Sequence, residues 1–425
     1  MVGVQFPDTP PVDATLEELS GLAETAGATV VGRLSQRRNR PDVALFLGKG
    51  KLEELKLLVG SHDAEVVLFN NDLSPGQKRN LEKALQVKVL DRTELILTIF
   101  ATRARTQEAR LAVELAQLEY ALPRLKQMWS HLSRIKKGIG MRGPGEKQLE
   151  EDRRIVERRI RDLREELRVN ERRRERQVAA RQDLSTVSLV GYTNAGKSTL
   201  LNTLTGAGVY TADKLFATLE TRTRRWQLPN WGPVLLSDTV GFIRDLPHHL
   251  IASFKATLEE TRQASLLLHV ADASSPSARE QICAVHDVLK ELGIEEKRTL
   301  LVLNKIDALP DRAMIQGLRA TYPNALAVSA HSGAGLDELA AVVSDALSGG
   351  FLDVDVEMGV ENGRLLAYLA AHGEVMSKRY HENQVVVHCR IPRSFLARIN
   401  GNGTPDANLI VRPHVNGSST LPIDR

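Results

Sequence analysis

The sequence predicts a multidomain α/β protein, with a small α/β domain, a long helical hairpin, a P-loop domain and a second small α/β module. Three observations support this prediction. Short apolar runs alternate with helix-like segments over roughly the first 100 residues, leucines then recur every three or four residues, and a β-like run from Ser185 leads into G-x-x-x-x-G-K-S. The 425 residues are enough for about two to four domains. We expect four domains, with the bounds 1–106, 107–183, 184–349 and 350–425.

The positive charge of the chain is concentrated in one segment. The net charge is only +4, although the pI is near 9.0. Between Arg124 and Arg181, about nineteen Lys and Arg stand against about ten Asp and Glu, an excess larger than the net charge of the chain. Two cysteines are too few for a disulfide framework or a zinc site. Because we find no signal-peptide pattern and no apolar run of about eighteen residues, we expect a cytoplasmic protein without a membrane span.

The first domain shows alternating strand and helix patterns. Thr15 is expected to cap a helix that carries Leu16, Leu19 and Leu22 on one face and ends at Gly27. The two following helices are expected at 48–61 and 74–86. Short buried strands are expected at 28–32, 44–48, 65–70 and 87–91.

The second region predicts an antiparallel pair of long helices. Apolar residues recur with helical spacing from Leu111 to Ile135 and again from Leu149 to Leu167, on either side of a glycine-rich stretch. That stretch contains GIGMRG, which matches a dinucleotide fingerprint by letter. It follows a helix rather than a strand, so we interpret the match as chance and the stretch as the tip of the hairpin. A plain flexible turn stays open. The glycines and basic residues together are also suited to entering a narrow, anionic place.

The third region contains the nucleotide site. In a P-loop, glycines let backbone amides surround phosphates, and the helix that follows adds positive potential. Lys197 would reach the β- and γ-phosphates, and Ser198 would bind Mg²⁺. The predicted loop residues are Gly191, Tyr192, Thr193, Asn194, Ala195, Gly196, Lys197, Ser198 and Thr199.

Further motifs indicate that the bound nucleotide is GTP. Each lies at the end of a predicted strand or between two strands. Thr218 would be a switch threonine on Mg²⁺, Asp238 would hold Mg²⁺ through water, and the Gly241 amide would contact the γ-phosphate. Asp307 could accept from two donors of guanine that adenine lacks, and the turn at Ser329 could offer an amide to the guanine oxygen. The full predicted set comprises Phe216, Ala217, Thr218, Leu219, Glu220, Asp238, Thr239, Val240, Gly241, Asn304, Lys305, Ile306, Asp307, Ser329, Ala330 and His331. We expect Lys197, Thr218 and Gly241 to be catalytic, and Ser198 and Thr218 to be metal ligands.

Two positions bear on the rate of hydrolysis. Phe242 follows the Asp-x-x-Gly motif and cannot orient a water molecule, so unassisted hydrolysis is expected to be slow. Packing of Phe242 beneath the switch is compatible with that role. Asn194 suggests a K⁺ ion beside the phosphates, with a purely structural asparagine as the equal alternative.

The motifs resemble the HflX family of ribosome-associated GTPases. The resemblance rests on LSPGQKRNLEKAL, GIGMRGPGEKQLEEDRR, GYTNAGKSTLLNTLT, FATLE and SDTVGFIRDLPHHLIASFKATLEE, and it spans most of the chain. Lys147 and Glu220 depart from the residues that are more usual in the family. The resemblance implies GTP-dependent binding to the large ribosomal subunit, with the hairpin tip directed toward the peptidyl-transferase centre, and splitting of stalled or idle ribosomes under stress. The residues expected to contact rRNA are Lys136, Lys137, Gly138, Gly140, Arg142, Gly143, Gly145 and Lys147.

The charge pattern agrees with an RNA-binding arm. The arm is rich in arginine and poor in aromatic residues, which is typical of phosphate and shape recognition rather than base stacking. The alternative for many of its charges is a solvated helix with internal ion pairs. We expect a monomer. Two rival functions are an ATP-driven RNA remodeller, suggested by GKGK at 48–51, and a scaffold whose hairpin binds a protein while the GTPase acts as a timer.

Overall fold

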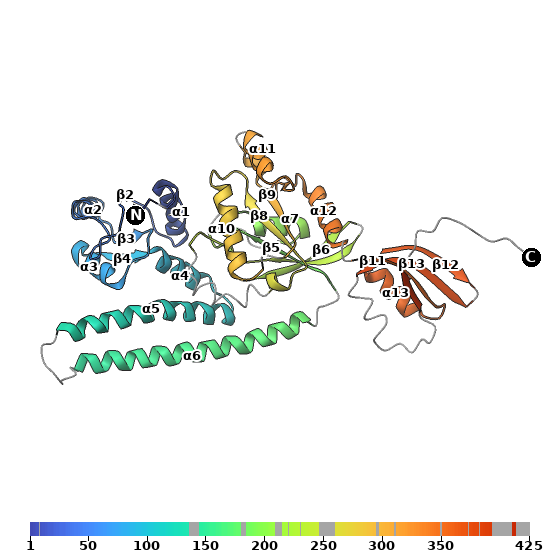
Figure 1. Cartoon of the computed structure of the whole chain (residues 1–425), viewed down its shortest axis with the longest axis horizontal. Coiled ribbons are helices and arrows are strands. Elements are labelled where there is room, and N and C mark those ends of the chain that lie inside the picture. Colours follow the sequence, from blue (N-terminus) through green and yellow to red (C-terminus); the bar gives the residue numbers. More distant parts are fainter. Residues whose placement is uncertain are drawn as a thin grey trace, which may run out of the picture.

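The computed structural model forms four parts in chain order (Figure 1). A small α/β domain and a longer α/β domain lie side by side, a helical hairpin runs beneath the first of them, and a small sheet domain carries the C-terminus. The structure describes residues 1–7, 9–135, 144–179, 184–208, 215–219, 221–229, 231–245, 260–294, 297–309, 312–348, 351–372, 374–381, 383–392 and 410–413.

The N-terminal domain is a four-stranded parallel sheet with helices on both faces. The strand order is β2-β1-β3-β4. Apolar side chains of α1 and α4 cover one face, and those of α2 and α3 cover the other. The elements are β1 (Val2–Gln5), α1 (Val12–Thr25), β2 (Leu34–Arg37), α2 (Lys49–Ser61), β3 (Val66–Phe69), α3 (Pro75–Leu85), β4 (Lys88–Asp91) and α4 (Arg92–Arg103).

Two of the four predicted strands of this domain are wrong. Residues 28–32 and 44–48 form no strand, and β1 and β2 fill the sheet instead. Phe46 and Leu47 are buried as predicted, but they reach the core from a loop in which Phe46 has a φ of 66°. The short edge strand β2 buries only Leu34, so it shows no apolar run. The strands predicted at 65–70 and 87–91 are confirmed as β3 and β4.

The predicted helix ends are partly correct. Thr15 is not a cap, because α1 already begins at Val12 after Pro11, and the Thr15 hydroxyl donates to the Val12 carbonyl. Gly27 does end the helix: its φ is 84°, and the Ala28 amide donates to the Ala23 carbonyl. At α3 a capping box forms between Ser74 and Gln77.

The hairpin consists of α5 (Gln107–Ile135) and α6 (Pro144–Ala179), which lie alongside each other. Leu111 and Leu115 of α5 pack with Ile160 and Leu163 of α6, as the leucine spacing predicts. Ion pairs join the two helices at Arg159–Glu114, 2.7 Å apart, and at Arg164–Glu119, also 2.7 Å apart. Part of the basic charge is therefore neutralised within the hairpin.

The central domain has a six-stranded sheet of order β10-β9-β8-β5-β7-β6, in which only β6 runs antiparallel to its neighbour. The parallel strands place their carboxyl ends at one edge, where the nucleotide motifs follow. The elements are β5 (Thr186–Gly191), α7 (Lys197–Thr205), β6 (Arg222–Leu228), β7 (Gly232–Asp238), β8 (Leu266–Asp272), α10 (Ala278–Glu291), β9 (Thr299–Asn304), η1 (Ile306–Ala308), α11 (Arg312–Thr321), β10 (Leu326–Ala327) and α12 (Leu336–Ser348).

The C-terminal module is an antiparallel sheet of order β12-β13-β11-β14 with the helix α13 packed on one face. Its buried side chains come from alternate positions of β11 and β13 and from Leu369 of the helix. The elements are β11 (Phe351–Gly359), α13 (Gly363–His372), β12 (Glu374–His381), β13 (Gln384–Pro392) and β14 (Ile410–Pro413). Among the helices that the structure describes, none combines the length and the apolar character needed to cross a membrane.

One apolar core joins the first three parts. It contains side chains of α1, α4 and α5 together with Tyr192, Phe216, Phe242 and residues of α10. Beside it, Asp91 is fully buried at the start of α4 and accepts hydrogen bonds from Tyr120 and Arg124 of the hairpin. The same carboxylate caps α4 through the Glu94 amide. The orientation of the hairpin is thus fixed by a buried charge of the N-terminal domain.

Replacing Asp91 is expected to loosen the hairpin from the N-terminal domain. Asp91→Ala leaves the Arg124 charge and the Tyr120 hydroxyl without their acceptor and should lower the free energy of unfolding by about 3–5 kcal/mol. Tyr120→Phe, which removes one hydrogen bond, should cost only about 1 kcal/mol. Urea denaturation followed by circular dichroism measures both. Equal stabilities of Asp91→Ala and wild type would contradict the assigned role.

Candidate nucleotide site

The loop between β5 and α7 has the backbone conformation of a phosphate-binding loop. Gly191 has a φ of 152°, and a Cβ there would lie 2.1 Å from the Val270 carbonyl oxygen. Gly196 has a φ of 89°, and a Cβ there would lie 2.4 Å from the side chain of Asn304. Both positions therefore require glycine, for conformation and for space. A pocket opens above this loop, lined by Thr193, Asn194, Gly196, Lys197, Ser198, Thr199, Phe216, Ala217, Thr218, Thr239 and Gly241.

Lys197 is buried against the loop that it follows. Its ammonium group donates to the carbonyl oxygens of Gly191, at 3.0 Å, and Tyr192, at 2.8 Å. Burial lowers the pKa of Lys197 to about 8, and the nearby Asp238 charge opposes that shift. The charge of this lysine therefore titrates within an accessible pH range, until an anion such as a phosphate holds the proton in place.

Three oxygen-bearing side chains converge beside Lys197. The Ser198 hydroxyl donates to Asp238 at 2.5 Å, and the Thr218 hydroxyl donates to the same carboxylate at 3.2 Å. Ser198 and Thr218 lie 2.8 Å apart. Burial raises the pKa of Asp238. Within the described part of the chain, Asp238 Oδ1 is buried without a hydrogen-bond partner. Hard oxygen donors around a buried acid fit a magnesium ion with its water ligands.

The phosphate loop is tied to both switch segments through Thr193. The Thr193 hydroxyl accepts from the Phe216 amide at 2.6 Å, and the Thr193 amide donates to the Phe242 carbonyl at 2.7 Å. At Gly241 a Cβ would lie 2.7 Å from Thr193 Cα, so only glycine allows this approach. Phe242 is 2% exposed and packs into the core shared with the N-terminal domain. The packing that the sequence analysis allowed for Phe242 is therefore present, and slow unassisted hydrolysis stays a prediction.

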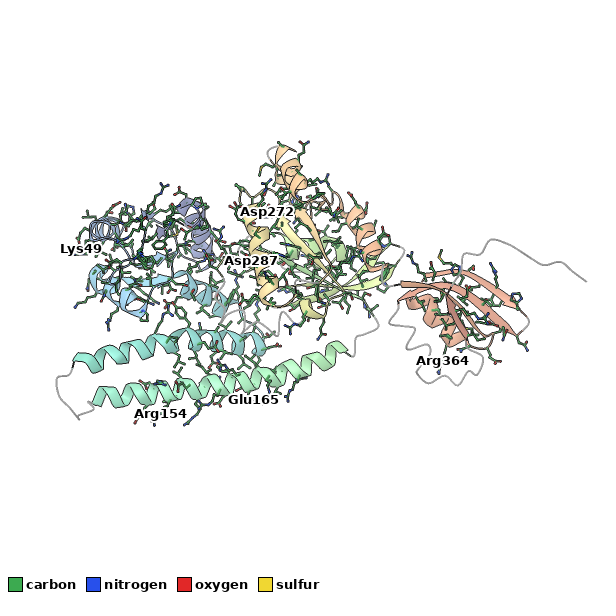
Figure 2. The ribbon with its side chains drawn as sticks, viewed as in Figure 1. Lys49, Arg154, Glu165, Asp272, Asp287 and Arg364 are labelled. Atoms are coloured by element: carbon green, nitrogen blue, oxygen red, sulfur yellow. The ribbon has the colours of Figure 1, made fainter. Side chains whose placement is uncertain are left out.

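The guanine-recognition motifs meet at the end of β9. The Asn304 side chain donates to the Ala195 carbonyl at 2.9 Å, which links this motif to the phosphate loop. Asp307 accepts from the Ser329 hydroxyl at 2.6 Å, and this bond lowers the pKa of the Asp307 carboxyl. The carboxylate is therefore ionised at neutral pH. The Lys305 ammonium group pairs at 2.7 Å with Asp272 (Figure 2). Asp272 is the last residue of β8, the strand next to β9.

The turn after β10 is held to the end of β9 by its own amides. The Ala330 amide donates to Asn304 Oδ1 at 2.9 Å, and the Ser329 amide donates to the Ala334 carbonyl. Ser329, Ala330 and His331 thus stand beside the guanine-recognition motif, and the contact of one of their amides with the guanine oxygen stays a prediction.

Several predicted residues cannot be assigned contacts. Glu220 and the tip positions Lys136, Lys137, Gly138, Gly140, Arg142 and Gly143 lie outside the described residues. Gly145 and Lys147 fall within the first residues of α6. The rRNA contacts of the tip stay predictions.

Two residues outside every sequence motif also reach the site. Glu18 of α1 accepts from the Tyr192 hydroxyl, and Arg92 of α4 donates to the Arg244 carbonyl. Glu18 stands 174 positions before Tyr192 in the sequence, and no motif marks it. Only the packing of α1 and α4 on the central domain brings these side chains to the phosphate loop.

Comparison with family models matches four consecutive stretches of the chain. The first two are described as GTP-binding GTPase N-terminal, over residues 13–101, and GTP-binding GTPase Middle Region, over 103–181. The third is described as 50S ribosome-binding GTPase, over 186–305, and the fourth as HflX C-terminal domain, over 314–394. The last match begins in α11, within the central domain, and continues through the C-terminal module.

Bacterial proteins match most of the chain. The GTPase HflX of Lacrimispora saccharolytica is 42% identical over 95% of this chain and 95% of its own length. The GTPase HflX of Escherichia coli K12 is 48% identical over 82% of this chain and 83% of its own. Among solved structures, a GTP-binding protein from Sulfolobus solfataricus in complex with GDP is 24% identical, covers 81% of this chain and 97% of its own, and has a TM-score of 0.42.

Exchange of Asp307 is expected to change the base preference. Asp307→Asn cannot accept from both guanine donors, so GTP affinity should fall about 100-fold, while the new amide can donate to the 2-oxygen of xanthine and should improve XTP binding. Titration with fluorescent nucleotides measures both affinities. Asp287→Asn, which alters an exposed carboxylate of α10 (Figure 2), is the matched control and should leave both unchanged. Unaltered GTP binding by Asp307→Asn would contradict the assignment.

Nucleotide affinity should depend on pH through Lys197. The pKa of this lysine is about 8 in the free protein, and bound phosphates raise it because they favour the charged form. Binding is therefore fully supported below pH 8, and GDP affinity should fall about tenfold per pH unit above 8. Calorimetry from pH 7 upward, below the range in which guanine itself loses a proton, measures this. Lys197→Arg should bind more weakly but show no such slope, and a flat wild-type profile would refute the prediction.

Proposed function

Because this chain belongs to the HflX family of GTPases, we propose that it binds the large ribosomal subunit in its GTP-bound state and splits stalled or idle ribosomes under stress. The GTP hydrolase activity and the binding of GTP and GDP follow from the family and its P-loop domain. The finer proposal includes a monomer that acts in the cytoplasm. The observation that carries it is a basic helical hairpin joined, through buried contacts, to the switch segments of the nucleotide site.

The residues of the site assign each part of GTP to a protein group. Lys197 and the amides of the phosphate loop bind the phosphates, and Asp307 selects the base. Ser198 and Thr218 would hold Mg²⁺, with Asp238 acting through its water ligands, and the ion would offset charge on the β- and γ-phosphates. The Gly241 amide would meet the γ-phosphate, which is supported by the closeness of Gly241 to Lys197: the ammonium group lies 3.2 Å from where a Gly241 Cβ would stand. Loss of the γ-phosphate would therefore release both switches.

The position of Phe242 makes the GTP-bound state long-lived. A buried phenylalanine at 242 leaves the attacking water without a side chain to orient it. We propose that a ribosomal group, or a K⁺ ion beside Asn194, supplies the missing stabilisation. Asn194 has a φ of 61° and an exposed side chain at the rim of the pocket, a position compatible with such an ion.

The hairpin carries a charge suited to RNA. Arg158, Arg161 and Arg168 of α6 are exposed, as is Arg154 (Figure 2), while Arg159 and Arg164 pair with glutamates of α5. The interhelical ion pairs join α5 to α6, and the exposed arginines, of which Arg168 also lies 3.5 Å from Glu165, present guanidinium groups that match phosphates. A basic helical hairpin whose two helices are joined by a glycine-rich sequence suits insertion among rRNA phosphates better than it suits a coiled-coil contact with a protein.

The nucleotide state can reach the hairpin over a short path. Asp91 contacts Tyr120 and Arg124 of the hairpin, and the adjacent Arg92 contacts Arg244, which follows the second switch. A shift of that switch therefore acts on the residue next to the one that holds the hairpin. The rival ATP-driven function has weaker support, because the Gly48 amide at the start of α2 already donates to Gln36 at 3.0 Å.

Co-sedimentation with purified ribosomal subunits tests the proposal. The protein should pellet with the large subunit in the presence of a non-hydrolysable GTP analogue and stay in the supernatant with GDP. A variant shortened between Gly138 and Gly145 should lose the binding, and raising salt from 50 to 200 mM should lower affinity on the order of 100-fold if about four phosphates are contacted. Splitting is measured separately as the release of subunits from intact ribosomes.

Two outcomes would contradict the proposal. Equal binding with GDP and with the GTP analogue would remove the nucleotide dependence. Binding that ignores both salt and the shortened tip would favour the scaffold function, since a protein partner held by apolar contacts responds little to salt. The shortened variant must retain wild-type GTP affinity, which shows that the nucleotide site is intact.

A further inference from the structure

A closed ring of hydrogen bonds joins the N-terminal domain to the nucleotide site. The Tyr192 hydroxyl donates to Glu18 and accepts from the Arg244 amide at 2.8 Å. Arg92 donates to Glu18 at 2.9 Å and to the Arg244 carbonyl at 3.2 Å. Four residues from α1, α4, the phosphate loop and the end of the second switch thus hold one another.

The ring is buried and pairs the Glu18 carboxylate with the Arg92 guanidinium. The side chains of Glu18 and Arg92 are 15% and 6% exposed, and Tyr192 is 4% exposed. Arg92 makes a further bond to the Asn70 side chain at 3.1 Å, which fixes the guanidinium plane. Removing Glu18 would leave a buried guanidinium and a buried hydroxyl without their acceptor, so the ring cannot be opened at one member without disturbing the others.

The first switch rests on the same two helices through apolar contacts. Phe216 packs edge-on against Phe100 of α4, with ring centroids 4.7 Å apart. Leu215 lies over Gly21 of α1, where a Cβ would come within 3.1 Å of the leucine side chain. Glycine in the middle of a helix is unfavourable relative to alanine, so its presence at this contact indicates that the space is needed for Leu215.

Both sets of contacts act on groups that would meet the γ-phosphate. Arg244 follows Gly241 by three residues, and the intervening Phe242 pairs its backbone with Gly191 and Thr193. Phe216 precedes Thr218 by two residues, and Thr218 already lies on Asp238. GDP has no γ-phosphate, so its binding depends less on these two switch segments. The N-terminal domain therefore supports the elements that distinguish GTP from GDP.

We propose that Glu18 and Arg92 are positioning residues of the GTPase site, which hold the second switch through Tyr192 and Arg244 and thereby raise the preference for GTP over GDP. We propose that Gly21 and Phe100, which contact Leu215 and Phe216, likewise hold the first switch in position. This role belongs to the nucleotide site itself and does not depend on ribosome binding.

Nucleotide titration of three variants tests the role of Glu18. Glu18→Ala should weaken binding of a non-hydrolysable GTP analogue about tenfold while GDP affinity changes less than about twofold, the size expected for loss of a charged hydrogen bond at the switch only. Glu18→Gln keeps an acceptor for Arg92 or Tyr192 and should recover part of the loss. Glu17→Ala is the matched control, because Glu17 is the neighbouring residue of α1 and pairs with Arg33 at the surface. It should match wild type for both nucleotides.

A double-variant cycle tests whether Glu18 and Tyr192 act as one unit or as two independent contacts. Tyr192→Phe removes a single hydroxyl, and Glu18→Ala combined with Tyr192→Phe should lose no more GTP-analogue affinity than Glu18→Ala alone. If the two losses multiply, the ring does not act as a unit and the proposal fails. Equal losses for GDP and the analogue in Glu18→Ala would also overturn it, since a merely structural role weakens both.

A variant at the other contact keeps the test decisive if Glu18→Ala does not fold. Gly21→Leu occupies the space of Leu215, so the first switch loses its contact with α1, while the better helix propensity of leucine offsets part of the cost of displacing Leu215. We expect GDP affinity within about twofold of wild type, which shows that the variant is folded, together with a loss of GTP-analogue affinity of about tenfold. Unchanged discrimination between GTP analogue and GDP in this variant would overturn the role of the N-terminal domain.

Discussion

Two consecutive charged residues at the start of α4 join the three main parts of the molecule. Asp91 faces the hairpin and accepts from Tyr120 and Arg124, whereas Arg92 faces the central domain and binds Glu18 and the Arg244 carbonyl. Both side chains are buried, so neither can lose its partners without a large cost. Because the two residues share one helix end, which the Asp91 carboxylate itself caps, hairpin and nucleotide site cannot move independently.

A second set of constraints holds the nucleotide motifs to one another. Thr193 binds both switches, and Asn304 binds the phosphate loop and the turn that follows β10. The tight approaches at Gly191, Gly196 and Gly241 leave no room for a side chain. In such a site, nucleotide contacts made by one motif are transmitted to the next through short hydrogen bonds rather than through flexible segments. The burial of Phe242 in the shared core also anchors the second switch. Position 242 therefore serves packing, whereas a glutamine at this position could orient the attacking water.

In the hairpin, one set of side chains holds the two helices together and another set forms the exposed basic surface. Its apolar seam and interhelical ion pairs use leucines, Glu114 and Glu119 to keep α5 and α6 together, and other arginines of α6 remain exposed. The charge pattern is compatible with a solvated, internally paired helix and with an RNA-binding arm, and the described residues contain features of both. Pairing within the arm is compatible with a basic surface, because the arginines outnumber the glutamates available to them.

The sequence by itself determined the α/β class, the hairpin and the nucleotide motifs, because each depends on local spacing: a loop of glycines before a lysine, leucines every three or four residues, acids at strand ends. Local spacing did not predict β2, because this short strand buries only one apolar residue and is held by pairing with its neighbour. It wrongly predicted a strand at 44–48, because Phe46 reaches the core from a loop. Only the tertiary structure revealed Glu18, Arg92 and Gly21 as neighbours of the switches. Their role arises from the packing of α1 and α4 against the central domain, and a contact between residues 174 positions apart leaves no periodic trace in the sequence.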